Sequence, residues 1–261
     1  MKKCICLTAA LSLLALTAGS AFADDTWTPG AGITGTPHDL SGATGIGPKY
    51  NANDTNNGLD RICVWCHAPH HAIQSSMAGG IDYLPIWNHG VTVQYYDTYD
   101  NGADDPDDSD TNPNTFLNRH QFNGQASLGQ PGSVSRLCLS CHDGTVAINE
   151  YGFEPGRLAS SGTRKGDTAA FIEDQWKIGA GGNLKNHHPI GFMYSDATAH
   201  DDEIADPSTP MGTDTTIGDL LYGGRMECVT CHDVHNSKNT GETFLWVSDV
   251  NSQFCLTCHL K

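Results

Sequence analysis

Cys228-Val229-Thr230-Cys231-His232 is the stretch of sequence that decides how this chain folds. The pattern Cys-x-x-Cys-His occurs four times, at residues 63–67, 138–142, 228–232 and 255–259, which we call the first to fourth motifs. The chain has 261 residues and 10 cysteines, and all the cysteines except two near the start belong to these motifs. Because a histidine follows every cysteine pair, the histidine is part of the pattern and needs a chemical explanation.

Cys-x-x-Cys-His is the attachment signature of c-type haem. The two thiols add to the two vinyl groups of one porphyrin, and the adjacent imidazole binds the iron from one side. The four motifs therefore predict four covalently bound haem c groups. The predicted attachment cysteines are Cys63, Cys66, Cys138, Cys141, Cys228, Cys231, Cys255 and Cys258, and the predicted proximal iron ligands are His67, His142, His232 and His259.

Two other interpretations of the cysteines are weaker. Four disulfides are possible in an exported chain, and zinc ribbons also use pairs of Cys-x-x-Cys units. Neither a disulfide nor a zinc ribbon requires a histidine directly after every cysteine pair. We therefore favour haem attachment at all four motifs.

The second axial position of each iron is expected to hold another histidine. Methionine in that position raises the reduction potential, histidine lowers it, and an open position allows substrate chemistry. After residue 23 the sequence has four methionines, and it has nine histidines outside the motifs. Four irons need only four of these ligands, so ligation by two histidines at every iron is available with a surplus.

Local sequence context ranks these histidines. His70 and His235 each lie three residues after a proximal histidine, where a side chain leaves its own haem and can reach a neighbouring one. Proline and glycine fix the backbone beside His188. The predicted second ligands are His38, His70 or His71 as its substitute, His89, His188 and His235. His120 and His200 stand in polar, loop-like sequence and are expected at the surface.

Residues 1–23 are expected to be a secretory signal peptide. Two lysines precede a short apolar stretch from Leu7 to Ala18, and Ala21-Phe22-Ala23 forms a small-x-small cleavage site. No later apolar run approaches the ~18 residues that a membrane span requires. The formal net charge of -16 argues against binding to nucleic acid. We expect an exported protein with no transmembrane segment and no nucleic-acid partner.

Residues 24–261 are expected to form one tetrahaem domain. They leave about 60 residues for each motif, too few for a separate core around each porphyrin. The 29 glycines and 12 prolines favour turns. The predicted fold is a multihaem cytochrome of mostly irregular loops and turns, with a few short helices and minimal strand, wrapped around a stack of four haems. Short helices are expected within Cys138 to Glu150 and Asp167 to Lys177, and a short strand within Val91 to Tyr99.

Two further features have less specific interpretations. The run from Asp100 to Asp110 contains six aspartates. It can bind a cation such as Ca²⁺, but it lacks the order of an EF-hand loop, and a solvated acidic loop is favoured. Five aromatic residues are expected to pack against haem or in the core rather than to carry electrons, namely Trp65, Trp87, Tyr95, Tyr96 and Tyr99.

Four phrases, at residues 63–71, 85–89, 137–145 and 188–191, resemble the doubled C-x-x-C-H multihaem cytochromes. The four-motif layout and the Cys-His-Leu-Lys end are similar to the OmcE-type tetrahaem nanowire cytochromes of metal-reducing bacteria. The resemblance covers most of the chain after the expected signal peptide. It implies haems with two histidine ligands in a continuous stack, and subunits polymerised into an extracellular filament. In such a filament one distal histidine can come from the adjacent subunit.

The main functional hypothesis is therefore an electron conductor without enzymatic activity, located at the cell surface or outside the cell. Its expected partners are further copies of itself, other cytochromes, and external acceptors such as metal oxides or other cells. One alternative is a monomeric electron shuttle in the periplasm, which the same motifs would serve. A second alternative is a multihaem reductase, which needs one iron with an open face. It is less favoured because all four motifs keep their histidine.

Overall fold

The computed structural model describes residues 27–41, 62–70, 72–73, 85–98, 130–151, 169–238 and 240–260. Loops and turns make up most of these residues, and the helices are short. The α-helices are α2 (Ser133–His142), α3 (Tyr194–His200), α4 (Ile217–Leu220), α5 (Cys228–Cys231) and α6 (Gln253–Cys258). The 3-10 helices are η1 (Cys63–Trp65), η3 (Asp174–Trp176), η4 (Ala180–Gly182) and η5 (Val250–Ser252). The predicted irregular fold with few short helices and minimal strand is confirmed.

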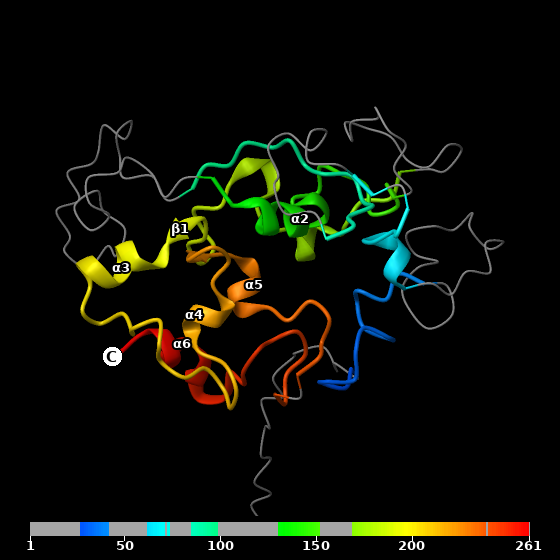
Figure 1. Ribbon diagram of the computed structural model, residues 1–261. Helices are drawn as coiled ribbons and strands as arrows, with labels where there is room; N and C mark the ends of the chain where they lie inside the picture. Colours follow the sequence, from blue (N-terminus) through cyan, green and yellow to red (C-terminus); the bar gives the residue numbers. More distant parts are fainter. Residues whose placement is uncertain are drawn as a thin grey trace, which may run out of the picture.

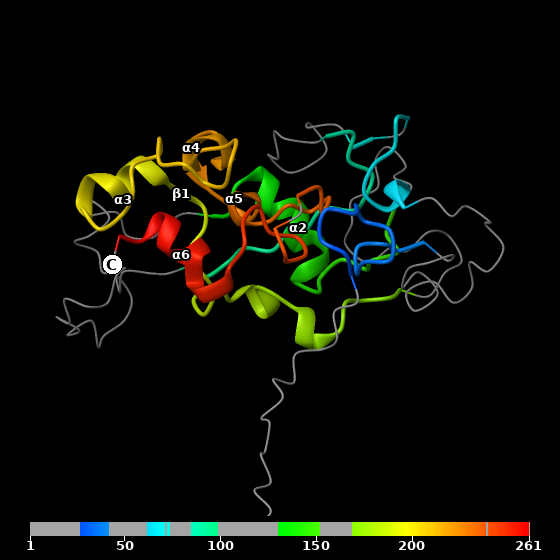
Figure 2. The same cartoon turned by 90° about the horizontal axis from the view of Figure 1, so that it is seen from below.

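The four motifs follow one another along the long axis of the molecule in the order of the sequence. η1, at the start of the first motif, lies at the right in Figure 1, α2 and α5 lie in the middle, and α6 lies toward the left. The view from below in Figure 2 shows the same succession. Residues 27–41, drawn in blue, return to the loop that follows α5, because the Asn236 side chain donates hydrogen bonds to the carbonyls of Thr28 and Gly32.

The two strands are β1 (Phe192–Met193) and β2 (Arg225–Met226), and they pair antiparallel, with Phe192 opposite Met226. The largest hydrophobic cluster forms around this pair. Ile217 and Met211 are almost completely buried in it, and Phe254 of α6 packs against its edge. This cluster therefore joins α3, α4 and the strands to the helix that carries the fourth motif.

Helix α2 occupies the centre of the molecule. Leu137 packs in one small cluster with Trp87 and Val91, and Leu139 packs in another with Tyr96. Two leucines two positions apart in a helix point to different sides. The second motif is thus held between two separate groups of apolar side chains.

The expected helix from Cys138 to Glu150 is wrong in its bounds. The helix is α2, which begins at Ser133 and ends at His142. Gly144 adopts a left-handed backbone with φ of 76°, a conformation that ends helices, so the helix stops directly after the motif. Within Asp167 to Lys177 the described residues form only η3.

The expected strand from Val91 to Tyr99 is extended but belongs to no sheet. Within it, only Asp97 forms an isolated bridge, to Asn183. The Gln130 side chain satisfies both backbone polar groups of Tyr96. Its oxygen accepts from the Tyr96 amide, and its nitrogen donates to the Tyr96 carbonyl. Side-chain contacts thus replace a neighbouring strand here.

Three of the five singled-out aromatic residues are core groups. Trp65, Trp87 and Tyr96 are buried, as predicted, whereas Tyr95 is 72% exposed and is not a core residue, so for Tyr95 only packing against haem stays a prediction. Tyr99, the expected signal peptide and the acidic run at 100–110 lie outside the described residues. No helix in the described part of the chain is long and apolar enough to cross a membrane.

Candidate haem-binding sites

Each motif folds as one helical turn. The backbone amide of His67 donates to the carbonyl of Cys63 at 2.8 Å, and that of His232 donates to Cys228 at 3.0 Å. The amide of His259 donates to Cys255 at 2.9 Å, and the second motif lies at the end of α2. A helical turn brings residues i, i+3 and i+4 to one side. Both cysteines and the histidine of each motif therefore face the same volume.

The motif histidines are also tied to distant segments. His67 forms an isolated antiparallel bridge with Trp87, His232 with Leu245 and His259 with Ile204. These bridges fix the backbone at three of the four motif histidines.

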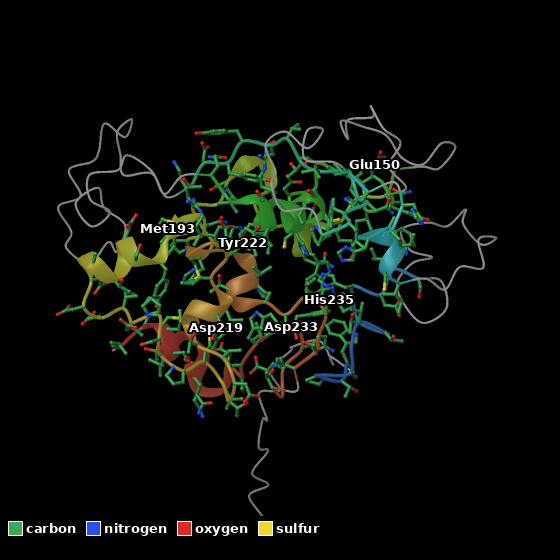
Figure 3. All side chains as sticks on the ribbon, viewed as in Figure 1. Glu150, Met193, Asp219, Tyr222, Asp233 and His235 are labelled. Atoms are coloured by element: carbon green, nitrogen blue, oxygen red, sulfur yellow. The ribbon has the colours of Figure 1, made fainter. Side chains whose placement is uncertain are left out.

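Three pairs of imidazoles lie close together, two of them edge to face and the pair of His67 and His235 tilted, and each pair joins a motif histidine to a predicted second ligand. The distances between ring centres are 6.2 Å for His67 and His235, 6.2 Å for His142 and His38, and 6.4 Å for His259 and His188. Figure 3 shows His235 on the loop after α5, at the centre of the molecule.

These distances match two imidazoles that bind one metal from opposite sides. A metal–nitrogen bond of about 2.0 Å, with ~1.1 Å from that nitrogen to the ring centre, places two such centres about 6.2 Å apart. Distance alone is not diagnostic, because the Trp87 ring lies 5.9 Å from His67. The match carries weight because each of the three pairs combines one motif histidine with one histidine that sequence context selects.

Backbone carbonyls orient three of these six rings. The Nδ1 atom of His67 lies 2.7 Å from the Pro85 carbonyl, and that of His142 lies 3.1 Å from the Trp176 carbonyl. His188 makes the same contact, at 2.9 Å, with the carbonyl of the next residue. A carbonyl at Nδ1 holds the proton on that atom and leaves Nε2 as the ligand atom for a metal, as in other metal-binding histidines.

His38 lies within a group of histidines from two motifs. Burial, and then the neighbouring His142, lower the pKa of His38 to about 4, and His232 and His235 act in the same direction. The neutral imidazole is the form that binds iron. The position of His38 therefore suits it as an iron ligand.

Not every predicted second ligand faces a motif histidine. His89 is buried, its Nε2 lies 3.1 Å from the Ala147 carbonyl, and the same atom lies 3.5 Å from Cys141 Sγ. His70 is exposed. Among the ring contacts of the described residues, none places an imidazole opposite His232. His71, His120 and the side chain of His200 lie outside the described part.

Consecutive motifs lie beside one another through their cysteines. The neighbouring pairs are Cys66 and Cys141, Cys138 and Cys228, and Cys231 and Cys258. Burial first, and the neighbouring thiol second, raise the pKa of Cys66 and of Cys231 to about 12. Contact with Cys228 is the main reason why the pKa of Cys138 is raised. The first motif therefore adjoins the second, the second the third, and the third the fourth.

The surroundings of the motifs fit a large flat apolar group. All eight motif thiols are free and none is fully buried. Val234, Leu256 and Leu260 lie within or next to the third and fourth motifs and are 39%, 50% and 57% exposed. A porphyrin attached at these motifs would have apolar side chains beside it to contact. In the described part of the chain, no cluster of at least three His, Cys, Asp or Glu residues could by itself hold a metal ion.

Sequence reasoning missed two aspartates that directly follow proximal histidines. Asp143 is buried and accepts hydrogen bonds from the hydroxyls of Thr92 and Tyr96, both at 2.6 Å. Asp233 accepts from the amide of His235 at 3.2 Å and from the hydroxyl of Ser237 at 2.7 Å. Asp143 thus anchors the extended segment 85–98, and Asp233 shapes the loop that carries His235 (Figure 3). The available signal was the aspartate after the histidine in two of the four motifs.

Comparison with known proteins adds one finding. Residues 223–261, which contain the third and fourth motifs, match the family model described as the doubled CXXCH motif. No curated protein and no solved structure matches the chain. The match covers a pair of consecutive Cys-x-x-Cys-His units, which supports covalent haem c attachment and a multihaem c-type cytochrome.

Proposed function

We propose that this chain carries electrons through four haem c groups, one at each motif. The observation that carries the proposal is the continuity of the sites, because the motifs adjoin one another in sequence order through their cysteines. Electrons pass efficiently only between cofactors that lie close together. A chain of adjacent sites from one end of the molecule to the other is suited to transfer along its length.

Three irons are completed within the chain in this proposal. We assign His235 to the iron that His67 would hold, His38 to the second motif and His188 to the fourth, and the ring-centre distances support these assignments. The second ligand of the third iron lies outside these three pairs. The resemblance to filament-forming cytochromes offers a histidine of an adjacent subunit for that position.

The haem supplies an iron that takes up and releases one electron, and the protein does the rest. The cysteines would attach each porphyrin to a helical turn, and two imidazole ligands would give each iron a low potential. Carbonyls at Nδ1 hold the imidazole rings in orientation. Packing then keeps these turns at fixed separation, so little rearrangement accompanies the change in charge.

Mass spectrometry and absorbance spectroscopy of the exported protein test this proposal. We expect the added mass of four haem groups and spectra of low-spin haem in both oxidation states. Absence of added tetrapyrrole mass would end the proposal.

Extracellular transfer by a filament is the finer form of the proposal. It rests on the sequence resemblance and on the expected signal peptide. Electron microscopy of material sheared from cells decides between filament and periplasmic shuttle. Ordered filaments that contain this protein support the first, and a protein recovered only as a periplasmic monomer supports the second.

A reductase is the second candidate. The observation that favours it is the lack of a paired imidazole at His232. No ring contact among the described residues pairs an imidazole with His232, although the His38 and His142 side chains lie near it. An iron with one open axial position can bind a substrate. Turnover of nitrite, hydroxylamine or sulfite would establish this activity. Fully low-spin protein that turns over none of them would exclude it.

A further inference from the structure

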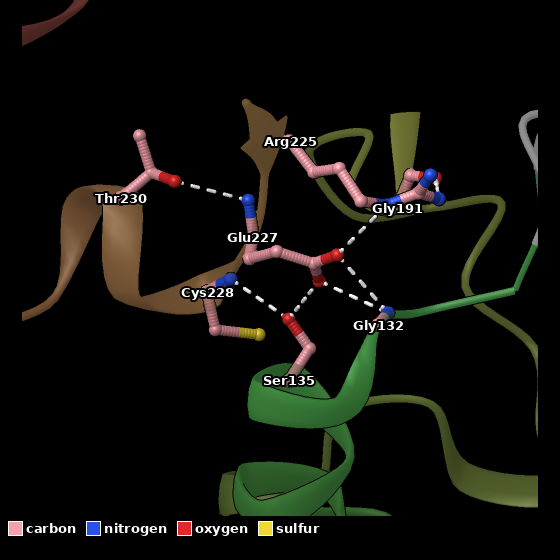
Figure 4. Close-up of polar contacts among 7 residues, drawn as sticks. All are labelled: Gly132, Ser135, Gly191, Arg225, Glu227, Cys228 and Thr230. Atoms are coloured by element: carbon pink, nitrogen blue, oxygen red, sulfur yellow. Dashed lines mark hydrogen bonds and ion pairs between the residues drawn. The ribbon is translucent and has the colours of Figure 1, made fainter. Parts of the chain in front are cut away.

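Glu227 is a buried carboxylate that has no part in the proposed iron ligation or haem attachment. It directly precedes the third motif and is 1% exposed. Its oxygens accept from the backbone amide of Gly132 at 3.0 and 3.2 Å and from the hydroxyl of Ser135. The Arg225 guanidinium lies 3.5 Å away as an ion pair. Figure 4 shows the carboxylate between the start of α2 and the start of α5.

The two motif-bearing helices cap each other through this contact. Glu227, which precedes α5, satisfies the amide at the start of α2. Ser135, in the first turn of α2, accepts from the amide of Cys228 at 2.9 Å and so satisfies the start of α5. The first amides of a helix lack partners within the helix, so each helix end depends on the other.

The junction is tightly packed. A Cβ atom on Gly132 would lie 2.3 Å from an oxygen of Glu227, closer than any real contact. Ser135 is completely buried. Cys138 lies one turn after Ser135, and Cys228 directly follows Glu227, so the same junction brings these two thiols together. The first attachment points of the second and third motifs thus meet at the carboxylate.

The charge at this junction costs folding stability. Burial raises the pKa of Glu227, against the opposing effect of Ser135, Arg225 and Gly132. A carboxyl group whose pKa is raised by burial destabilises the fold when it ionises. The other titratable groups that face it are the thiol of Cys228, which haem attachment would remove, and Arg225. Stability alone gives no reason to place an acid here.

We propose that Glu227 is a positioning residue that clamps the second and third motifs together and sets both the separation and the potentials of the haems they hold. The inference rests on the proposed function, because it requires haem at both motifs. Its carboxylate bridges two helix starts, and its negative charge lies beside both attachment sites. A negative charge near an iron favours the oxidised, more positive state, so removing that charge makes reduction easier.

The test uses the mature holoprotein and the variant Glu227→Gln, which keeps the size of the side chain and removes its charge. In a potentiometric titration followed by absorbance, we expect two of the four haems to become easier to reduce by about three- to tenfold in equilibrium constant, or about 30 to 60 mV at 59 mV per tenfold. The difference from the natural protein should shrink as pH falls and the natural carboxylate is protonated. Glu203 is an exposed glutamate, and Glu203→Gln is the matched control. This control should leave the potentials of the haems at the second and third motifs unchanged.

A second measurement separates position from charge. Ser135→Ala keeps the carboxylate but removes the hydroxyl between the helices, and Gly132→Ala displaces the carboxylate with its charge retained. Circular dichroism of the Soret band reports coupling between adjacent haems. Both variants are expected to weaken that coupling, and Glu203→Gln to leave it unchanged.

Four haems with unaltered potentials in Glu227→Gln, or unaltered Soret coupling in both other variants, would overturn the inference. If Glu227→Gln fails to mature, Gly132→Ala and Ser135→Ala decide by the same coupling measurement. A natural protein without haem would instead remove the proposed function, so the two failures are distinguishable.

Discussion

At the scale of single residues, the orientation of each imidazole decides whether it can serve as a second iron ligand. His187 and His188 are adjacent in the sequence, yet only the ring of His188 faces a motif histidine, His259. Its Nδ1 lies against a backbone carbonyl and its other nitrogen is left for a ligand. In the proposed ligation the two neighbouring histidines therefore have different roles, which makes them a natural pair for experiment.

His188→Ala is expected to convert one of four haems to the high-spin form, because the iron held by His259 loses its second imidazole. Absorbance and electron paramagnetic resonance spectra of the holoprotein check this. His187→Ala is the control and should remain fully low-spin. Equal spectra of the two variants would disprove the assignment of His188.

At the scale of elements, the extended segment 85–98 is held by side chains rather than by a sheet. Asp143, at the end of α2, accepts from Thr92 and Tyr96 of this segment. Similarly, α2 begins without a side-chain cap of its own and is capped by Glu227, 95 residues away. Elements of this protein are thus completed by distant parts of the chain.

Asp143→Asn is expected to lower the free energy of unfolding by about 2 to 4 kcal/mol, since a buried carboxylate with several hydrogen bonds loses part of them. Denaturant unfolding of the holoprotein measures the loss. Asp174→Asn, an exposed aspartate paired with Lys177, is the control and should unfold like the natural protein. Similar stability of both variants would show that Asp143 does not anchor the segment.

Two adjacent glycines in η4 allow a matched test of backbone crowding. Both have left-handed backbones, with φ of 65° at Gly181 and 84° at Gly182. A Cβ on Gly181 would meet nothing, whereas one on Gly182 would lie 2.8 Å from the carbonyl of Tyr95. Gly181→Ala should cost about 1 to 2 kcal/mol for backbone strain, and Gly182→Ala clearly more. Thermal unfolding of the two variants measures the loss of stability in each. Equal losses would show that the carbonyl of Tyr95 does not crowd residue 182.

At the scale of the whole molecule, the protein core is divided into small parts. Among the residues that the structure describes, the largest cluster has eight buried residues and the others have four, three and two, so no single core within this part holds the four motifs together. The porphyrins are therefore expected to supply much of the missing apolar contact.

The chain expressed without haem attachment should accordingly lack a cooperative thermal transition, because bound cofactor contributes to stability only when it is present. Near-ultraviolet circular dichroism and calorimetry of the haem-free protein test this. A sharp cooperative transition in that material would mean that the polypeptide folds by itself.

The sequence predicted local features well and distant ones poorly. Each motif is a helical turn, so five consecutive residues are sufficient to place its cysteines and histidine on one side. The start of α2 was missed because its cap, Glu227, lies far along the chain. His38, His188 and His235 were selected from local context, but their partners depend on folding over long distances, which no local pattern encodes. His89 was selected by the same reasoning and lies against carbonyls instead.

The contact between His67 and His235 links the earliest motif to a residue near the end of the chain. A polypeptide that leaves the cytoplasm from its N-terminus delivers Cys63 and Cys66 long before it delivers residue 235. The first porphyrin to be attached would then be among the last to gain its sixth ligand. Attachment of this porphyrin would thus precede the binding of its second histidine. A chain whose export stopped before residue 235 would carry, near its N-terminus, an iron without that ligand.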